Sequence, residues 1–87
     1  MISSAQVSIY PLKQPKIGPI IKQTRAIFQH HGLDIHPGSM STVVSGEFDT
    51  LFAALKEAYR TATEGGQAVM VITLSNACPG PDPSNPI

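Results

Sequence analysis

The stretch HPGSMSTVVSGEFDTLFAALKEAY, residues 36–59, decides the fold. It begins as a loop, continues as a short strand over residues 42–47, and passes directly into a helical pattern over residues 48–63. That pattern predicts a helix with one apolar face, made of Phe48, Leu51, Phe52, Leu55, Ala58, Tyr59 and Ala62. Glu47 or Asp49 then supplies negative charge at the positive end of the helix dipole.

The first strand and the first helix of the chain are predicted ahead of this stretch. Residues 5–12, AQVSIYPL, alternate with a period of two, which predicts a strand whose regular pairing ends at Pro11. Residues 19–31 repeat apolar positions at helical spacing, with Pro19 at the first helical position and Gly32 just past the end.

Two further strands complete the pattern. Residues 33–39 predict a short strand, and Pro37 predicts that this strand lies at a sheet edge because proline cannot donate a ladder hydrogen bond. Residues 67–75, QAVMVITLS, are apolar on both faces, which is typical of a strand covered on both sides.

The resulting order is strand, helix, strand, strand, helix, strand. It predicts an α+β fold, the ferredoxin-like βαββαβ sandwich, whose four-stranded antiparallel sheet has the strand order 4-1-3-2 and carries two helices on one face. Residues 1–76 form this single domain, and residues 77–87 form a proline-rich tail.

One face of the predicted sheet has no helix. On that face the last strand presents either Val69, Val71 and Thr73 or Met70, Ile72 and Leu74, and both sets are too apolar for water. We therefore expect a homodimer, or a homotetramer, in which two sheets pack face to face.

Composition excludes several partner classes. The 87 residues carry a formal net charge of +0, and no basic run is present to attract nucleic acid or an anionic membrane. No apolar stretch is as long as a membrane span, and the N-terminus lacks the pattern of a signal peptide. The single cysteine, Cys78, excludes an intrachain disulfide, so we expect a soluble cytoplasmic protein.

The sequence offers no pattern typical of catalysis or metal binding. The histidines are His30, His31 and His36, of which the first two point to different faces of one helix end. No nucleophile has an obvious histidine partner, and no acid and base are paired at a recognisable spacing. We expect no catalytic residue, no metal and no cofactor.

A ligand pocket is predicted where the end of the first strand lies beside the start of the third. There Tyr10 is expected close to Thr42, and the predicted ligand-binding residues are Ser8, Tyr10, Ser39, Met40, Ser41 and Thr42. An aromatic ring, a thioether and several hydroxyls suit a flat polar heterocycle. The alternative is that Ser-Met-Ser-Thr is a hairpin bend, whose hydroxyls bond to the local backbone.

Four short motifs carry a resemblance to a known family. They are Tyr10-Pro11-Leu12, Gly32-Leu33, Met40-Ser41-Thr42 and Gly46-Glu47. In this order and spacing the chain resembles the thiamine-binding protein family, the YkoF-like group, from about residue 5 to residue 75. The resemblance implies a ferredoxin-like fold, assembly through sheets into dimers or tetramers, binding of thiamine or its hydroxymethylpyrimidine moiety, and no catalysis.

Two details depart from the family pattern, and two other functions stay open. Ser41 stands where glycine is common, and Ser45 stands where an acidic residue is common. The first expectation is a binding protein for salvage, transport or sequestration of thiamine or a related pyrimidine. The alternatives are an amino-acid-binding regulatory module, which shares the strand and helix order, and a purely structural oligomerisation unit.

Overall fold

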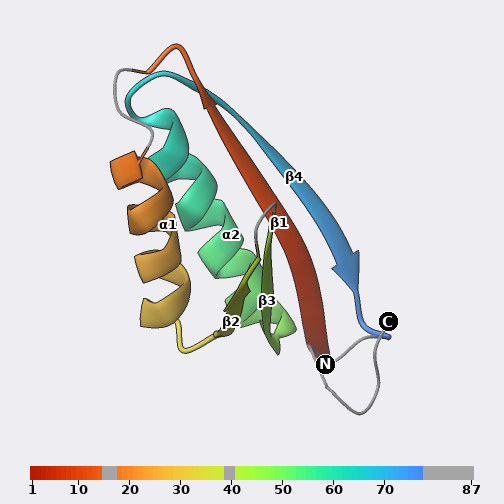
Figure 1. The fold of residues 1–87 in the computed structure, drawn as a ribbon. Coiled ribbons are helices and arrows are strands. Elements are labelled where there is room, and N and C mark those ends of the chain that lie inside the picture. The colour runs from red at the N-terminus through yellow and green to blue at the C-terminus, as the bar shows by residue number, and fades with distance from the viewer. Residues whose placement is uncertain (15–17, 39–40, 78–87) are drawn as a thin grey trace.

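The chain folds as a four-stranded antiparallel sheet with both helices on one side (Figure 1). The computed structural model describes residues 1–14, 18–38 and 41–77. The elements are β1 (Ile2–Leu12), α1 (Gly18–His30), β2 (Asp34–Pro37), β3 (Thr42–Glu47), α2 (Phe48–Thr63) and β4 (Gln67–Ser75). The strand order β2-β3-β1-β4 confirms the predicted ferredoxin-like sandwich, with β2 at an edge. Cys78 and the rest of the proline-rich tail lie outside the described residues.

The central strand β1 is longer than predicted and pairs differently with its two neighbours. It begins at Ile2, and β3 lies beside it only as far as Val7, whereas β4 lies beside it through Leu12. The prediction that Pro11 ends regular pairing is therefore wrong, because Pro11 is opposite Ala68 of β4. Beyond Val7 no described strand flanks the other edge of β1, so a residue without an N–H group is tolerated there.

The helix α2 supplies most of the core. Leu51, Ala54 and Ala58 have no exposed surface, and they pack with the sheet residues Ala5 and Val44. The spacing 51, 54, 55, 58 and 62 is one helical stripe, which confirms the predicted core positions Leu51, Leu55, Ala58 and Ala62.

Phe48, Phe52 and Tyr59 lie at the edge of that stripe rather than in it. Phe52 is 44% exposed and Tyr59 is 48% exposed, so the prediction that both belong to the buried face is wrong. Ala54, which the sequence pattern missed, is buried instead. One residue along a helix turns the side chain by about 100°, which is enough to move Phe52 out of the core.

Two of the four short motifs have a structural role. Gly32 takes a positive φ of 73°, which ends α1 and turns the chain so that Leu33 enters the core. A side chain at Gly46 of β3 would collide with the Leu33 side chain. The glycine in Gly46-Glu47 therefore makes room for the leucine in Gly32-Leu33.

Glu47 caps the start of α2. Its Oε2 accepts a hydrogen bond of 2.8 Å from the backbone N–H of Asp49, and its Oε1 lies 3.8 Å from the N-terminal amine of Met1. This carboxylate therefore stabilises the helix start, as the sequence predicts for Glu47 or Asp49.

The outer strand β4 is exposed on both faces. Its register places Val69, Val71 and Thr73 on the helix-free face, beside Tyr10, Ser8 and Gln6 of β1. Val71 is 52% exposed on that face, and Ile72, on the helix side, is still 41% exposed. The exposure of the helix-free face agrees with the predicted bare face of the sheet. On the other face, the exposure of Ile72 shows that the described helices cover β4 only in part. Among the described residues, no helix combines the length and the hydropathy that crossing a membrane requires.

Candidate ligand-binding site

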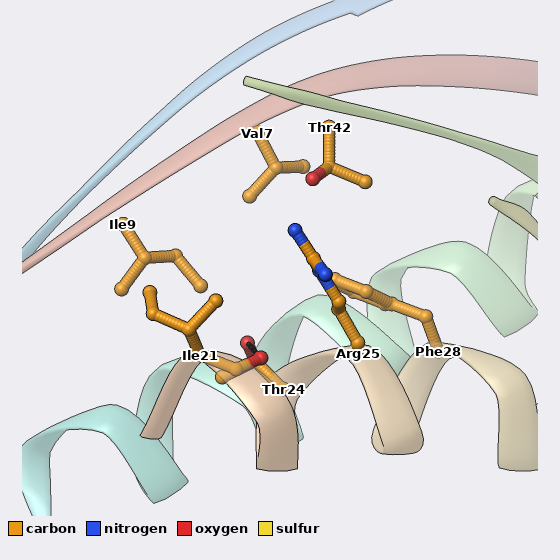
Figure 2. Close-up of a pocket in the computed structure, with 7 residues that line it drawn as sticks. All are labelled: Val7, Ile9, Ile21, Thr24, Arg25, Phe28 and Thr42. Atoms are coloured by element: carbon orange, nitrogen blue, oxygen red, sulfur yellow. Dashed lines mark hydrogen bonds between the residues drawn. The ribbon is translucent and has the colours of Figure 1, made fainter. Parts of the chain in front are cut away.

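A small cavity of about 50 Å³ lies between α1 and the helix-covered face of the sheet. Figure 2 shows its lining residues, which come from three elements. Two belong to β1, one to β3 and four to α1: Val7, Ile9, Thr42, Ile21, Thr24, Arg25 and Phe28.

The cavity exists because the two helices pack differently. The helix α2 contacts β1, β3 and β4, whereas α1 packs mainly on α2 and β2. In addition β3 begins at Thr42, opposite Val7, so no β3 residue lies beside Ile9. The space between α1 and this part of β1 is consequently only partly filled.

The lining is apolar except for three side chains. The side chains of Val7 and Ile9 point from β1 toward Ile21 and Phe28 of α1 (Figure 2). Phe28 is only 2% exposed. Apolar walls with a few polar groups are typical of sites for small organic ligands. The polar groups here are the hydroxyls of Thr24 and Thr42 and the guanidinium of Arg25.

The three polar groups differ in what they can still bond. The Thr24 hydroxyl donates a 2.8 Å hydrogen bond to the carbonyl of Ile21, so it retains only its capacity to accept. The Thr42 side chain points from β3 toward α1 (Figure 2), where its hydroxyl can both donate and accept. The Arg25 guanidinium extends from α1 toward Val7 and Thr42 (Figure 2).

The cavity is small and partly open. A water molecule needs roughly 10–15 Å³ of such space, so about 50 Å³ corresponds to three to five waters. A cavity that admits benzene has about 150 Å³, roughly three times this volume. A six-membered heterocycle therefore enters only with one edge, unless the lining side chains move apart.

The predicted site residues do not converge at one place. Thr42 lines the cavity, but it lies opposite Val7, and Tyr10 lies opposite Val69, three residues further along β1. The expected proximity of Tyr10 and Thr42 is therefore wrong. Side chains alternate between the faces of a strand, so Thr42 shares the helix side with Val7, and Tyr10 points to the helix-free side.

Ser8 and Ser41 also belong to the helix-free side. Ser8 alternates with Val7 along β1. The Ser41 hydroxyl lies 2.9 Å from Nε2 of Gln6, from which it accepts a hydrogen bond, and the Ser41 carbonyl accepts from the backbone N–H of Gly38 at 2.8 Å. Ser41 thus has the contacts of a hairpin bend. Ser39 and Met40, the other two predicted site residues, lie outside the described residues.

Six of the seven lining residues are absent from the predicted set of site residues. The helical spacing of residues 19–31 predicts only that Thr24 faces the core and that Arg25 faces solvent. One signal was available: Thr24 is the polar residue in the middle of an otherwise apolar stripe. Nothing in the sequence indicates that the long side chain of Arg25 reaches back over the cavity.

The rest of the described chain includes a histidine–carboxylate contact and an apolar groove. No cluster of three or more metal-ligating side chains was found among residues 1–14, 18–38 and 41–77. His31 lies 2.7 Å from a carboxylate oxygen of Glu57 and so ties α1 to α2. A wider, open groove of about 280 Å³ between α2 and β4 is lined almost wholly by apolar side chains: Phe52, Leu55, Lys56, Tyr59, Met70 and Ile72.

Comparison with known proteins places these features in a family. Residues 5–75 match the family model described as thiamine-binding protein. The chain is 34% identical over 58 residues to the UPF0045 protein MJ1052 of Methanocaldococcus jannaschii, an alignment that covers 66% of this chain and 58% of that relative. The chain thus spans less than two thirds of the length of that relative.

Solved structures share the fold. The crystal structure of MJ1052 superposes with a TM-score of 0.77 at 27% identity, over 86% of this chain and 79% of that one. A Streptococcus pneumoniae protein gives the same TM-score of 0.77 and 27% identity, with 86% of each chain covered. A candidate thiamine biosynthesis or salvage protein of Thermotoga maritima, 17% identical, gives 0.73 over 85% of this chain and 82% of that one, which shows a shared fold alone.

The family match begins within β1 and runs to the end of β4, and it includes every residue that lines the cavity. It also spans all four short motifs, two of which have the structural roles described above. The chain belongs to the thiamine-binding protein family.

Proposed function

We propose that this protein binds thiamine or its hydroxymethylpyrimidine moiety without transforming it, in salvage, transport or sequestration. The observation that supports this most strongly is the cavity between α1 and the sheet. Its walls are mostly apolar, and its polar groups come from both walls, Thr24 and Arg25 from α1 and Thr42 from β3. A ring would enter its open side and widen it. The family membership favours thiamine or its pyrimidine over other flat heterocycles.

The chemistry of an aminopyrimidine matches this lining. The ring offers two acceptor nitrogens, one amino donor and two flat faces. The Thr42 hydroxyl can bond a ring nitrogen or the amino group, and the acceptor capacity of Thr24 suits the amino group. Ile21 and Phe28 would contact the ring faces.

Thiamine as a whole is larger than the cavity. Of its two rings, the pyrimidine is the better occupant because the thiazolium carries a positive charge. No acidic residue is among those that line the cavity, and the guanidinium of Arg25 would repel a cation there. We therefore expect the pyrimidine inside and the thiazolium outside.

Calorimetric titration of the wild-type protein tests this function. Thiamine and hydroxymethylpyrimidine are each titrated, with a panel of free amino acids as the comparison. Binding of either pyrimidine compound supports the proposal. Binding of an amino acid alone would favour a regulatory module, and binding of no compound would favour a structural oligomerisation unit.

Replacing Thr42 by Val is expected to weaken pyrimidine binding. Valine keeps the shape of threonine and removes the hydroxyl, so a buried ligand atom loses its hydrogen bond, which costs roughly 1–3 kcal/mol, or about five- to 150-fold in affinity. Fold stability should change less, since valine is a good strand residue. Affinity by calorimetry and melting temperature are measured side by side.

Tyr10→Phe is the matched control for Thr42→Val. It also removes one hydroxyl, but from the part of β1 that pairs only with β4 and on the other face of the sheet. We expect its affinity to stay within about twofold of wild type. If Tyr10→Phe weakens binding and Thr42→Val does not, the ligand lies on the helix-free face and the cavity is not the site.

The helix-free face supports assembly through the sheet. Its exposed side chains along β4 and the end of β1 are apolar or aromatic, among them Val69 at 46% and Tyr10 at 52%. These side chains gain from burial, so we propose a homodimer or homotetramer that packs sheet on sheet. The expected location is the cytoplasm.

A further inference from the structure

The side chain of Arg25 gives the cavity a charge preference. Arg25 is on α1 between Thr24 and Phe28, two lining residues, and its guanidinium extends over the cavity toward Val7 and Thr42 (Figure 2). An arginine on the outer side of the helix could equally extend into solvent. Here it forms part of the cavity lining instead.

No described acidic residue neutralises this cation. The ion pairs among the described residues are Met1 with Glu47 and His31 with Glu57. The helix α1, GPIIKQTRAIFQH, contains no acidic residue at all. Arg25 thus brings an uncompensated positive charge to the side of an apolar cavity.

Hydrogen-bond donors outnumber acceptors at this place. The guanidinium carries five N–H donors in a planar fork, and the Thr42 hydroxyl can add one more. The Thr24 hydroxyl has already used its proton on the carbonyl of Ile21. A ligand rich in acceptor atoms is therefore preferred, and an arginine fork binds a phosphate or a carboxylate through two parallel N–H donors. Of these two groups, a phosphate is the one that forms an ester with the hydroxyl of hydroxymethylpyrimidine.

We infer that Arg25 makes this cavity selective for a phosphate monoester of the pyrimidine over both the free alcohol and cationic thiamine. This inference rests on the proposed function, because it assumes that the pyrimidine ring occupies the cavity. The ring lies between Val7, Ile9 and Ile21, and the ester oxygens lie outside, within reach of the exposed Arg25 side chain. Thiamine carries its positive charge on the group that would take the place of the phosphate, where the guanidinium repels it.

Three ligands and three proteins test the inference by calorimetry. The ligands are hydroxymethylpyrimidine, its phosphate monoester and thiamine, and inorganic phosphate is titrated alone to measure binding that needs no ring. The proteins are wild type, Arg25→Gln and Lys22→Gln. Lys22 is an exposed cation on the same helix that does not line the cavity, so its variant matches the change in charge.

Wild type is expected to bind the phosphate monoester about tenfold or more tightly than the alcohol, a ratio equivalent to about 1.4 kcal/mol. Arg25→Gln should reduce this ratio to about one. Lys22→Gln should retain the ratio. Because the charges attract through partly exposed space, the ratio of the wild type should also fall as salt is raised.

Several results would overturn the inference. Equal affinity of wild type for ester and alcohol would do so while leaving the proposed function intact. If the preference for the ester persists in Arg25→Gln, or if Lys22→Gln abolishes it equally, the preference comes from the overall charge of the protein and not from Arg25. If inorganic phosphate binds as tightly as the ester, the ring contributes nothing to binding and the inference fails. Binding of neither the alcohol, the ester nor thiamine would refute the proposed function and the inference together.

Discussion

Replacing Leu55 by Ala is expected to lower the free energy of unfolding by roughly 2–5 kcal/mol. Leu55 is 4% exposed and lies in the core cluster with Leu51 and Ala58. The substitution removes buried methyl groups and leaves a space that the rigid sheet and helix close only in part. Urea denaturation followed by circular dichroism measures the change, at one protein concentration because assembly adds to apparent stability.

Phe52→Ala is the control for Leu55→Ala. Phe52 has the larger side chain but is 44% exposed, and its ring contacts that of Phe48 at a centroid distance of 4.8 Å. We expect a cost of at most about 1.5 kcal/mol, since full burial of a phenylalanine contributes about 1.5–3 kcal/mol. A cost for Phe52→Ala equal to that for Leu55→Ala would mean that the buried stripe of α2 is centred elsewhere.

Replacing Val71 by Glu is expected to dissociate the proposed sheet-to-sheet assembly. Val71 is 52% exposed at the middle of β4, on the helix-free face and opposite Ser8. In an assembly with two-fold symmetry the carboxylate would be buried twice without a partner, which should raise the dissociation constant about 100-fold or more. Size-exclusion chromatography with light scattering measures the mass of each variant at micromolar concentration.

Gln29→Glu provides the matched control for assembly. It adds the same charge at an exposed position of α1, on the helix-covered side of the sheet. This variant should assemble like wild type. A monomeric wild type, or a Val71→Glu variant with the mass of wild type, would contradict packing through the helix-free face.

The order and type of the elements could be predicted because each strand or helix has its own periodicity. The alternation in β1 and the helical spacing in α2 are local properties, and Gly32 ends α1 for a local steric reason. Strand order followed from the rules for connecting such elements. Even the edge position of β2 could be predicted from one residue, Pro37.

The site could not be predicted to the same extent because it depends on strand register. Periodicity does not say which residue of β1 lies opposite Thr42, and an offset of three residues moves the neighbour from Tyr10 to Val7 and to the other face. The same limit applies to Phe52, for which one helical position decides between core and surface.

The role of Arg25 depends on a different property. Its position on the polar side of α1 predicts an exposed residue, and the backbone position is indeed at the surface. The length of an arginine side chain allows its charged end to lie well away from its Cα. Only the three-dimensional structure indicates that the guanidinium extends over the cavity toward Thr42 (Figure 2).

Backbone chemical-shift mapping with hydroxymethylpyrimidine tests most directly whether the cavity between α1 and the sheet is the ligand site. Isotopically labelled protein is titrated, and the amide shifts of both sheet faces are followed together. The largest changes are expected at Thr24, Phe28 and Thr42, which enclose the cavity. Changes at Ser8 and Tyr10, with none along α1, would contradict the account and assign the ligand to the helix-free face.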